Sequence, residues 1–209
     1  METRYSKNSF DLSKLTKLLT SSMIFSCYFL KVTAQQVDAD RLASLPPLTI
    51  GDSIPEVVWQ MPLRVANHPE GKDTISLANY REKTLIILDF WATWCKPCIK
   101  SVIKIDSLIK ELGSEEVAFL PVQVYDLVPN AYKFLQKHQW ELPTIVGDTV
   151  LNKRAFYNYL TGFGVVWIAD GKLLAVPQPK DITFTNLTKA LSREQLNIEH
   201  RKGYPLLEK

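Results

Sequence analysis

The sequence predicts an α/β fold in which a central mixed sheet is flanked by helices. Three observations predict it. Residues 84–91 form a mostly apolar run typical of a buried strand, with Asp89 inside it, and apolar residues after Cys98 recur at helical spacing. Further along, Asp170-Gly171 separates two apolar runs, which indicates an antiparallel hairpin. With 209 residues and 46% hydrophobic content, the chain is long enough to bury one domain of this kind.

Periodicity and turn residues predict the other elements in order. Gly113 should end the helix that begins near Cys98, and Pro121 should place part of its strand at an edge or bulge, because proline donates no ladder hydrogen bond. The expected elements are a short strand at 57–59, a loop at 64–73, a helical turn at 75–80, a strand at 84–90, a helix at 98–112, a strand at 117–125, a helix at 130–140, a loop at 141–148, a helix at 149–160, strands at 165–169 and 172–176, and a helix at 183–196.

The net charge of +3 gives no support to nucleic-acid binding. Residues 1–34 carry five Lys or Arg against Glu2 and Asp11, so they account for the whole excess, and the rest of the chain is neutral. No basic stripe interleaved with aromatic residues occurs elsewhere in the sequence. We therefore expect no nucleic-acid partner. The sequence makes no prediction of the oligomeric state.

Residues 1–34 have the pattern of an export signal. A basic region leads into the apolar residues 18–30, and Val32-Thr33-Ala34 fits cleavage after Ala34. Two alternatives stay open: an uncleaved anchor, because Lys31 precedes the cut, and a lipoprotein signal at Cys27. The expected organisation is a signal peptide at 1–34, a flexible leader at 35–47, a domain at 48–196 and a C-terminal extension at 197–209. The expected location is the periplasm or cell envelope, with the protein soluble or anchored.

Cys95 and Cys98 carry the strongest functional signal. They stand in Trp94-Cys-Lys-Pro-Cys98, where the buried strand gives way to a helix, and the amides and dipole of a helix start favour a thiolate. A dithiol at this spacing can close a small disulfide and leave one sulfur exposed. Cleavage after Ala34 would leave this pair as the only thiols. A single close pair does not make a structural disulfide framework. We therefore predict that this pair is the reactive group of the protein.

A zinc site is the other interpretation of a Cys-x-x-Cys pair, and the sequence argues against it. No second cysteine pair exists, and the three histidines are scattered along the chain (His68, His138 and His200). We therefore predict neither a metal nor a cofactor.

The segment Leu88-Asp-Phe-Trp-Ala-Thr-Trp-Cys-Lys-Pro-Cys98 resembles the active-site segment of thioredoxin-fold proteins. Residues 50–55 and 168–172 are similar to the exported TlpA/ResA type of thiol–disulfide oxidoreductase, and the resemblance covers roughly 48–195. It implies a thioredoxin-like fold. It also implies that Cys95 attacks a substrate disulfide and that Cys98 resolves the mixed disulfide.

Asp89 is the predicted proton partner of Cys98. By the period of two it lies on one face of a strand made otherwise of apolar residues, and burial would raise its pKa. The resemblance matches it to the buried aspartate of thioredoxins. The alternative is a polar residue that caps the next turn.

Residues around the pair have predicted supporting roles. Lys96 should depress the pKa of Cys95 and make the disulfide more oxidising, unless it is only a solvated charge. Pro97 should shape the start of the helix. Trp91 and Trp94 should shield the disulfide and contribute to the substrate surface, with core packing as the alternative.

The sequence departs from the family pattern at one position. The family places a cis-proline opposite the disulfide, and that position falls on Phe163, between Gly162 and Gly164. We expect a trans bond there, because a cis bond to a non-proline residue costs about 2.5–4 kcal/mol. Pro143 is the alternative occupant. Gly162, Phe163 and Gly164 are thus candidate substrate-binding residues.

The predicted function is thiol–disulfide exchange with envelope proteins, working as a reductase that needs an electron-donating membrane partner. One alternative, motivated by the absent proline, is a thioredoxin-like binding or chaperone module with little turnover. Another is a thiol peroxidase, for which Thr93 stands close to Cys95.

Overall fold

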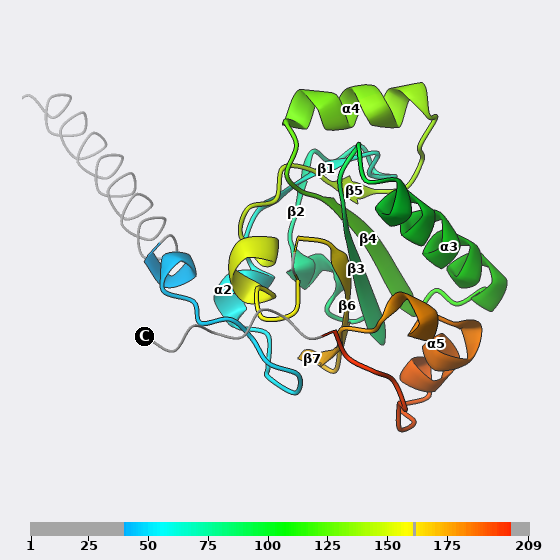
Figure 1. Cartoon of the computed structure of the whole chain (residues 1–209). Helices are drawn as coiled ribbons and strands as arrows, with labels where there is room; N and C mark the ends of the chain where they lie inside the picture. Colours follow the sequence, from blue (N-terminus) through cyan, green and yellow to red (C-terminus); the bar gives the residue numbers. More distant parts are fainter. Residues whose placement is uncertain (1–39, 161, 202–209) are drawn as a thin grey trace, which may run out of the picture. The chain divides into compact units, whose positions relative to one another are not determined.

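A mixed β-sheet forms the centre of the domain, in the strand order β2-β1-β5-β4-β3-β6-β7 (Figure 1). The computed structural model describes residues 40–160 and 162–201, and the unit that holds the sheet begins at Ser44. Its strands are β1 (Leu63–Ala66), β2 (Thr74–Ile75), β3 (Leu85–Trp91), β4 (Val117–Gln123), β5 (Thr144–Ile145), β6 (Gly164–Ala169) and β7 (Lys172–Ala175). The predicted α/β fold with a mixed sheet is confirmed.

Helices cover this sheet. Figure 1 shows α3 and α5 side by side on one face, and α4 across the end at which β3 and β4 finish. The helical elements are α2 (Glu56–Trp59), the 3₁₀ turn η1 (Leu77–Tyr80), α3 (Lys96–Leu112), α4 (Val128–Lys137), the π-helical turn η2 (Leu151–Ala155), the 3₁₀ turn η3 (Pro179–Asp181) and α5 (Phe184–Leu191). None of the helices in the described residues has the length and apolar character to cross a bilayer.

Strand β3 is the buried centre of the sheet. All seven of its residues are buried, and it pairs with β4 in parallel and with β6 antiparallel. Leu85 and Ile87 pack in one cluster with Ile105 of α3 and Leu187 of α5. Because side chains alternate along a strand, Asp89 lies on this same face, beneath α3. The sheet therefore carries a carboxyl group directly under the helix that bears the cysteines.

Two local predictions are confirmed by backbone geometry. Asp170 and Gly171 both have positive φ, 48° and 72°, as the two central residues of a tight hairpin between β6 and β7 require. Gly113 ends α3 in the left-handed conformation, with φ 60°, and its N–H donates to Ile109 O.

Several element predictions are wrong. Residues 57–59 belong to helix α2, because a short apolar run fits either a strand or a helix. The expected loop at 141–148 contains β5, and the expected helix at 149–160 is the π-helical turn η2 followed by turns. Helix α5 ends at Leu191, short of the expected residue 196.

Pro121 does not mark an edge. Strand β4 lies between β3 and β5, and Pro121 pairs with Asp89 in the parallel ladder. Strand β5 pairs with β4 only at Val122 and Ile145, so most of β4 has no hydrogen-bonded neighbour strand on the β5 side. A proline is accommodated inside the sheet because its neighbouring strand is so short.

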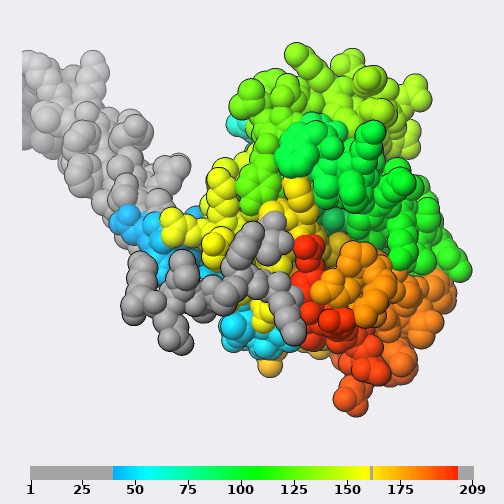
Figure 2. All heavy atoms as spheres, in the orientation of Figure 1, coloured from blue at the N-terminus to red at the C-terminus, as the bar shows by residue number. Residues whose placement is uncertain are grey.

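The C-terminal part of the described chain returns to the domain. His200 forms an isolated bridge with Pro177, and the N–H of Arg201 donates to Val176 O at 2.8 Å. His200 and Arg201 thus contact the segment that follows β7, although the sequence assigns them to an extension. In Figure 2 this segment (red) lies beside the α5 region (orange). The predicted signal peptide at 1–34 lies outside the described residues.

Candidate active site

The two cysteines lie at the N-terminus of α3 and form a disulfide, with their Cα atoms 5.3 Å apart. Cys95 is the N-cap residue, Lys96 opens the helix, and Pro97 follows at the second position, where its missing N–H is no loss. Cys98 is buried, whereas Cys95 is partly exposed and Lys96 is exposed. The geometry makes Cys95 the sulfur that a second molecule can reach.

A cavity of about 300 Å³ opens beside the disulfide. Its walls come from four parts of the chain: the end of β3, the start of α3, the loop that enters β6, and residues 177–201. The lining is mostly apolar, and its polar members are Asp89, Ser101 and Arg201. Residues more than 100 positions apart in the sequence thus meet around the two sulfurs.

Asp89 lies in the wall of this cavity with 1% of its surface exposed. Its Oδ2 atom has no hydrogen-bond partner. Burial raises the pKa of Asp89 to about 8, and the neighbouring Ser101 hydroxyl offsets part of that rise. At neutral pH the carboxyl is therefore largely protonated while the disulfide is closed. Asp89 pairs within the sheet and is no turn cap.

The loop opposite the disulfide is Gly162-Phe163-Gly164. Gly164 begins β6 and pairs with Phe90, next to the end of β3, and Phe163 lines the same cavity as both cysteines. Pro143 instead precedes β5, which lies on the other side of β4. Phe163 is thus the residue that faces the disulfide, and the described residues contain no cis peptide bond.

Two further aromatic rings contact Phe163. Trp94 is 62% exposed and stands edge-on to Phe163, with the ring centroids 5.4 Å apart, and Tyr125 approaches Phe163 edge-on at 5.7 Å. Trp91 is different. It is fully buried and stacked on Trp140 at 5.5 Å, so the alternative of core packing holds for it and the surface role is wrong.

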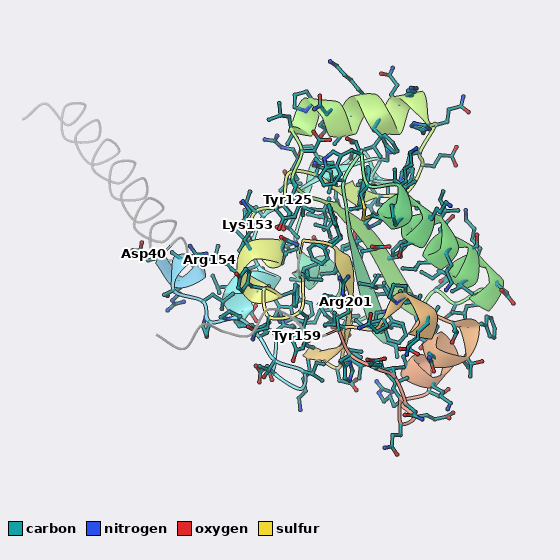
Figure 3. All side chains as sticks on the ribbon, viewed as in Figure 1. Asp40, Tyr125, Lys153, Arg154, Tyr159 and Arg201 are labelled. Carbon is teal, nitrogen blue, oxygen red and sulfur yellow. A yellow bond between two sulfur atoms is a disulfide. The ribbon has the colours of Figure 1, made fainter. Side chains whose placement is uncertain are left out.

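Three residues at the site were not predicted from the sequence. Asn152, in η2, donates through Nδ2 to Gly162 O at 2.8 Å, and it accepts a hydrogen bond from the Tyr125 hydroxyl at 2.7 Å. Arg201 donates to Phe163 O. Figure 3 labels Tyr125 and Arg201. No motif marks these residues, because Asn152 and Arg201 bond to backbone carbonyl groups, which are the same for every residue type.

Gly164 is held in a conformation that excludes a side chain. Its φ is 151°, and a Cβ atom placed there would lie 2.6 Å from an Arg201 nitrogen and 2.9 Å from Leu160 Cδ2. The glycine therefore lets Arg201 approach the loop closely.

Metal ligands do not gather at this site. Within residues 40–160 and 162–201, no group of three His, Cys, Asp or Glu side chains is arranged to hold a metal ion.

A model of the AhpC/TSA family matches residues 50–162, more than half of the chain. The chain belongs to the AhpC/TSA family. Among curated proteins, this AhpC/TSA chain is similar to the thiol-disulfide oxidoreductase ResA of Geobacillus thermodenitrificans, with 33% identity over 78 residues. The ResA of Geobacillus kaustophilus is 32% identical over 78 residues. Each match covers 36% of this chain and 44% of the relative, so the chain spans less than half the length of the curated relatives it matches.

Solved structures show that this AhpC/TSA chain has the thioredoxin-like fold that its sequence predicts. The thioredoxin domain of the thiol-disulfide oxidoreductase BVU-2223 from Bacteroides vulgatus superposes with a TM-score of 0.54 at 15% identity, covering 69% of this chain and 99% of that domain. A DsbF homologue from Corynebacterium diphtheriae gives 0.51 at 19% identity, with coverages of 70% and 90%. A mutant of PrxQ from Xylella fastidiosa gives 0.52 at 15% identity, with coverages of 70% and 94%.

Proposed function

We propose that this AhpC/TSA chain is a thiol–disulfide oxidoreductase that exchanges disulfides with other proteins through Cys95 and Cys98. The observation that carries the proposal is the position of the pair. A partly exposed sulfur at a helix N-terminus is joined to a buried one, and a protonated carboxyl lies in the wall of the same cavity. The similarity to ResA proteins supports the same chemistry.

In the reducing direction the exchange has two steps. The Cys95 thiolate attacks a substrate disulfide, forms a mixed disulfide and releases one substrate thiolate. Cys98 then loses its proton and attacks the Cys95 sulfur, which releases the second substrate thiolate. The substrate gains two electrons, and the enzyme ends as the disulfide that the structure shows.

Asp89 is suited to carry the Cys98 proton in both directions. When a donor thiolate attacks Cys95 of the closed disulfide, Cys98 leaves as a thiolate, and a protonated carboxyl with a pKa of about 8 can supply its proton. In resolution the ionised carboxylate removes that proton again. The cavity that both residues line gives the proton a short path.

Export to the periplasm or cell envelope is part of the proposal and rests on the sequence of residues 1–34. In that compartment the substrates would be envelope proteins with cysteines. Since each turnover as a reductase oxidises the pair, a membrane partner that supplies electrons is required as well.

Insulin reduction tests this function. We expect the wild-type protein with dithiothreitol to precipitate insulin chains far faster than dithiothreitol alone, because a helix N-terminus favours the thiolate form of a cysteine, which is the attacking species. Binding of reduced insulin chains without any acceleration would instead support the chaperone alternative and contradict the proposal.

A peroxidase is the second candidate, because Arg201 lines the same cavity as Cys95 and an arginine near the thiol suits peroxide reduction. The position of Thr93 argues against a peroxidase, because its hydroxyl group donates to Asp126. Rapid consumption of hydrogen peroxide by the dithiothreitol-reduced protein, without a protein substrate, would favour this candidate.

Lys96→Glu is expected to lower the reduction potential of the pair by roughly 10–30 mV, measured by equilibration with glutathione. The cation at the first helical position favours the Cys95 thiolate and hence the reduced form, and an anion there would disfavour it. Lys100→Glu, also on exposed α3 surface, is the matched control. Equal shifts in the two variants would mean that Lys96 is only a solvated charge.

A further inference from the structure

The loop that faces the disulfide is held by side chains from three other parts of the chain. Asn152 donates to Gly162 O, Arg201 donates to Phe163 O, and the ring of Tyr125 lies edge-on to Phe163. Two successive carbonyl groups of the loop are therefore bonded to side chains. A proline ring would restrict the backbone at this position, whereas here the loop carries two glycines.

Asn152 is the most buried member of this set. It is 2% exposed, and both ends of its amide are used: Oδ1 accepts from the Tyr125 hydroxyl and Nδ2 donates to Gly162 O. Because Oδ1 is fixed by Tyr125, the amide group is oriented with its donor toward the loop. Gly162 in turn packs on the Tyr125 ring, since a Cβ atom there would lie 3.4 Å from ring carbon Cε2.

The element that carries Asn152 is itself fixed. The buried carboxylate of Asp148 accepts from the backbone N–H groups of the three residues at the start of η2, at 3.0–3.2 Å (Val150, Leu151 and Asn152). Lys153 of η2 lies over the Tyr125 ring, with its Nζ atom 5.8 Å from the ring centroid, and Figure 3 labels both residues. A π-helical turn is rare and is often found at functional sites. Asn152 thus has a rigid support.

We propose that Asn152 is a positioning residue that, with Tyr125, holds the substrate-facing loop 162–164 in the place where this chain has no proline. The effect of Asn152 on substrate binding rests on the proposed function. The effect of Asn152 on the conformation of the loop does not depend on that function. The loop borders Cys95 and presents Phe163 to the cavity, so a protein substrate must dock against it, while a small disulfide needs only the sulfur.

Asn152→Ala tests the proposal by comparing insulin with glutathione disulfide as substrates. We expect the KM for insulin to rise about three- to ten-fold, because that is the effect of losing one buried hydrogen bond. The kcat should change less than about two-fold. The KM for glutathione disulfide should rise by a smaller factor. Amide hydrogen exchange of Phe163 and Gly164 should accelerate in the same variant.

Tyr125→Phe is the second variant, because Tyr125 is 48% exposed and the change keeps its ring. It should act in the same direction as Asn152→Ala with a smaller effect. The double variant should be no worse than Asn152→Ala alone, because both changes break one chain of contacts. Asn158→Ala is the matched control, since this side chain donates to backbone carbonyls of Pro47 and Leu48 and should leave both KM values unchanged.

Equal KM increases for insulin and glutathione disulfide, additive effects in the double variant, or unchanged exchange of the loop amides in Asn152→Ala would each overturn the proposal. If the wild-type protein reduces no disulfide, the proposed function fails. The exchange measurement then still decides whether Asn152 holds the loop.

Discussion

Cys95→Ser is expected to abolish insulin reduction, while Cys98→Ser should allow the first attack and then stop. Cys95 is the partly exposed sulfur at the N-cap of α3, and Cys98 is buried behind it. Without Cys98 the mixed disulfide has no internal thiol to resolve it, so it should accumulate as a covalent complex. Mass spectrometry of Cys98→Ser incubated with a disulfide substrate measures that complex, and a steady-state assay should show a loss of at least about 10³-fold for either variant.

The two serine variants also serve as controls for each other. Each removes one sulfur and the disulfide, so a difference in trapping cannot come from the loss of the disulfide alone. Trapping by Cys95→Ser instead of Cys98→Ser would reverse the proposed roles. Full turnover by either variant would remove the disulfide-exchange mechanism altogether.

Asp89→Asn is expected to stabilise the protein at neutral pH and to slow its chemistry. In the folded state the pKa of Asp89 is about 8, against 3.8 for the ordinary carboxyl group. Between pH 4 and 8 the unfolded chain has lost this proton and the folded one keeps it, so stability falls as pH rises through this window. The cost at pH 7 is on the order of 4 kcal/mol, which the asparagine variant should largely recover.

Urea unfolding across pH 4–9 measures this effect. The wild-type free energy of unfolding should fall by up to about 1.4 kcal/mol per pH unit below pH 8 because of Asp89, and Asp89→Asn should remove that slope. Asp106→Asn is the matched control, because that carboxylate lies on α3 and bonds to Lys110 at the surface. Parallel slopes in the wild type and Asp89→Asn would contradict a strongly raised pKa.

Although Asp89→Asn should stabilise the fold, it should slow catalysis. With no carboxyl group beside Cys98, release of the mixed disulfide should slow by about 10²-fold or more near neutral pH, the range typical of general acid–base catalysis. Its pH–rate profile should lack the ionisation of Asp89 that we expect in the wild type. An unchanged profile would mean that Asp89 is no proton carrier.

The central part of the fold could be predicted because its signals are local. The apolar run of β3, the helical spacing of α3 up to Gly113 and the Asp170-Gly171 turn each determine their own conformation. Strand β5 could not be found this way. Two residues show no periodicity, and Thr144 and Ile145 become a strand only through their neighbours β1 and β4.

The same difference between local signals and contacts formed only in the fold applies to the residues of the site. Cys95, Cys98, Asp89 and Phe163 lie where the sequence places them because all four are defined by their distance along the chain from the ends of β3 and β6. Asn152 and Arg201 instead donate to backbone carbonyl groups of the loop 162–164, and every residue type carries such a group. Such contacts leave no pattern in the sequence.

The contact of Arg201 with the loop also sets an order of events during biosynthesis. Arg201 is made roughly 100 residues after Cys98, which corresponds to about 5–20 s of ribosomal elongation. Throughout that interval the nascent chain already carries both thiols, while the last side chain that bonds to the opposite loop does not yet exist. The two thiols are thus present in the growing chain before the site around them can be complete.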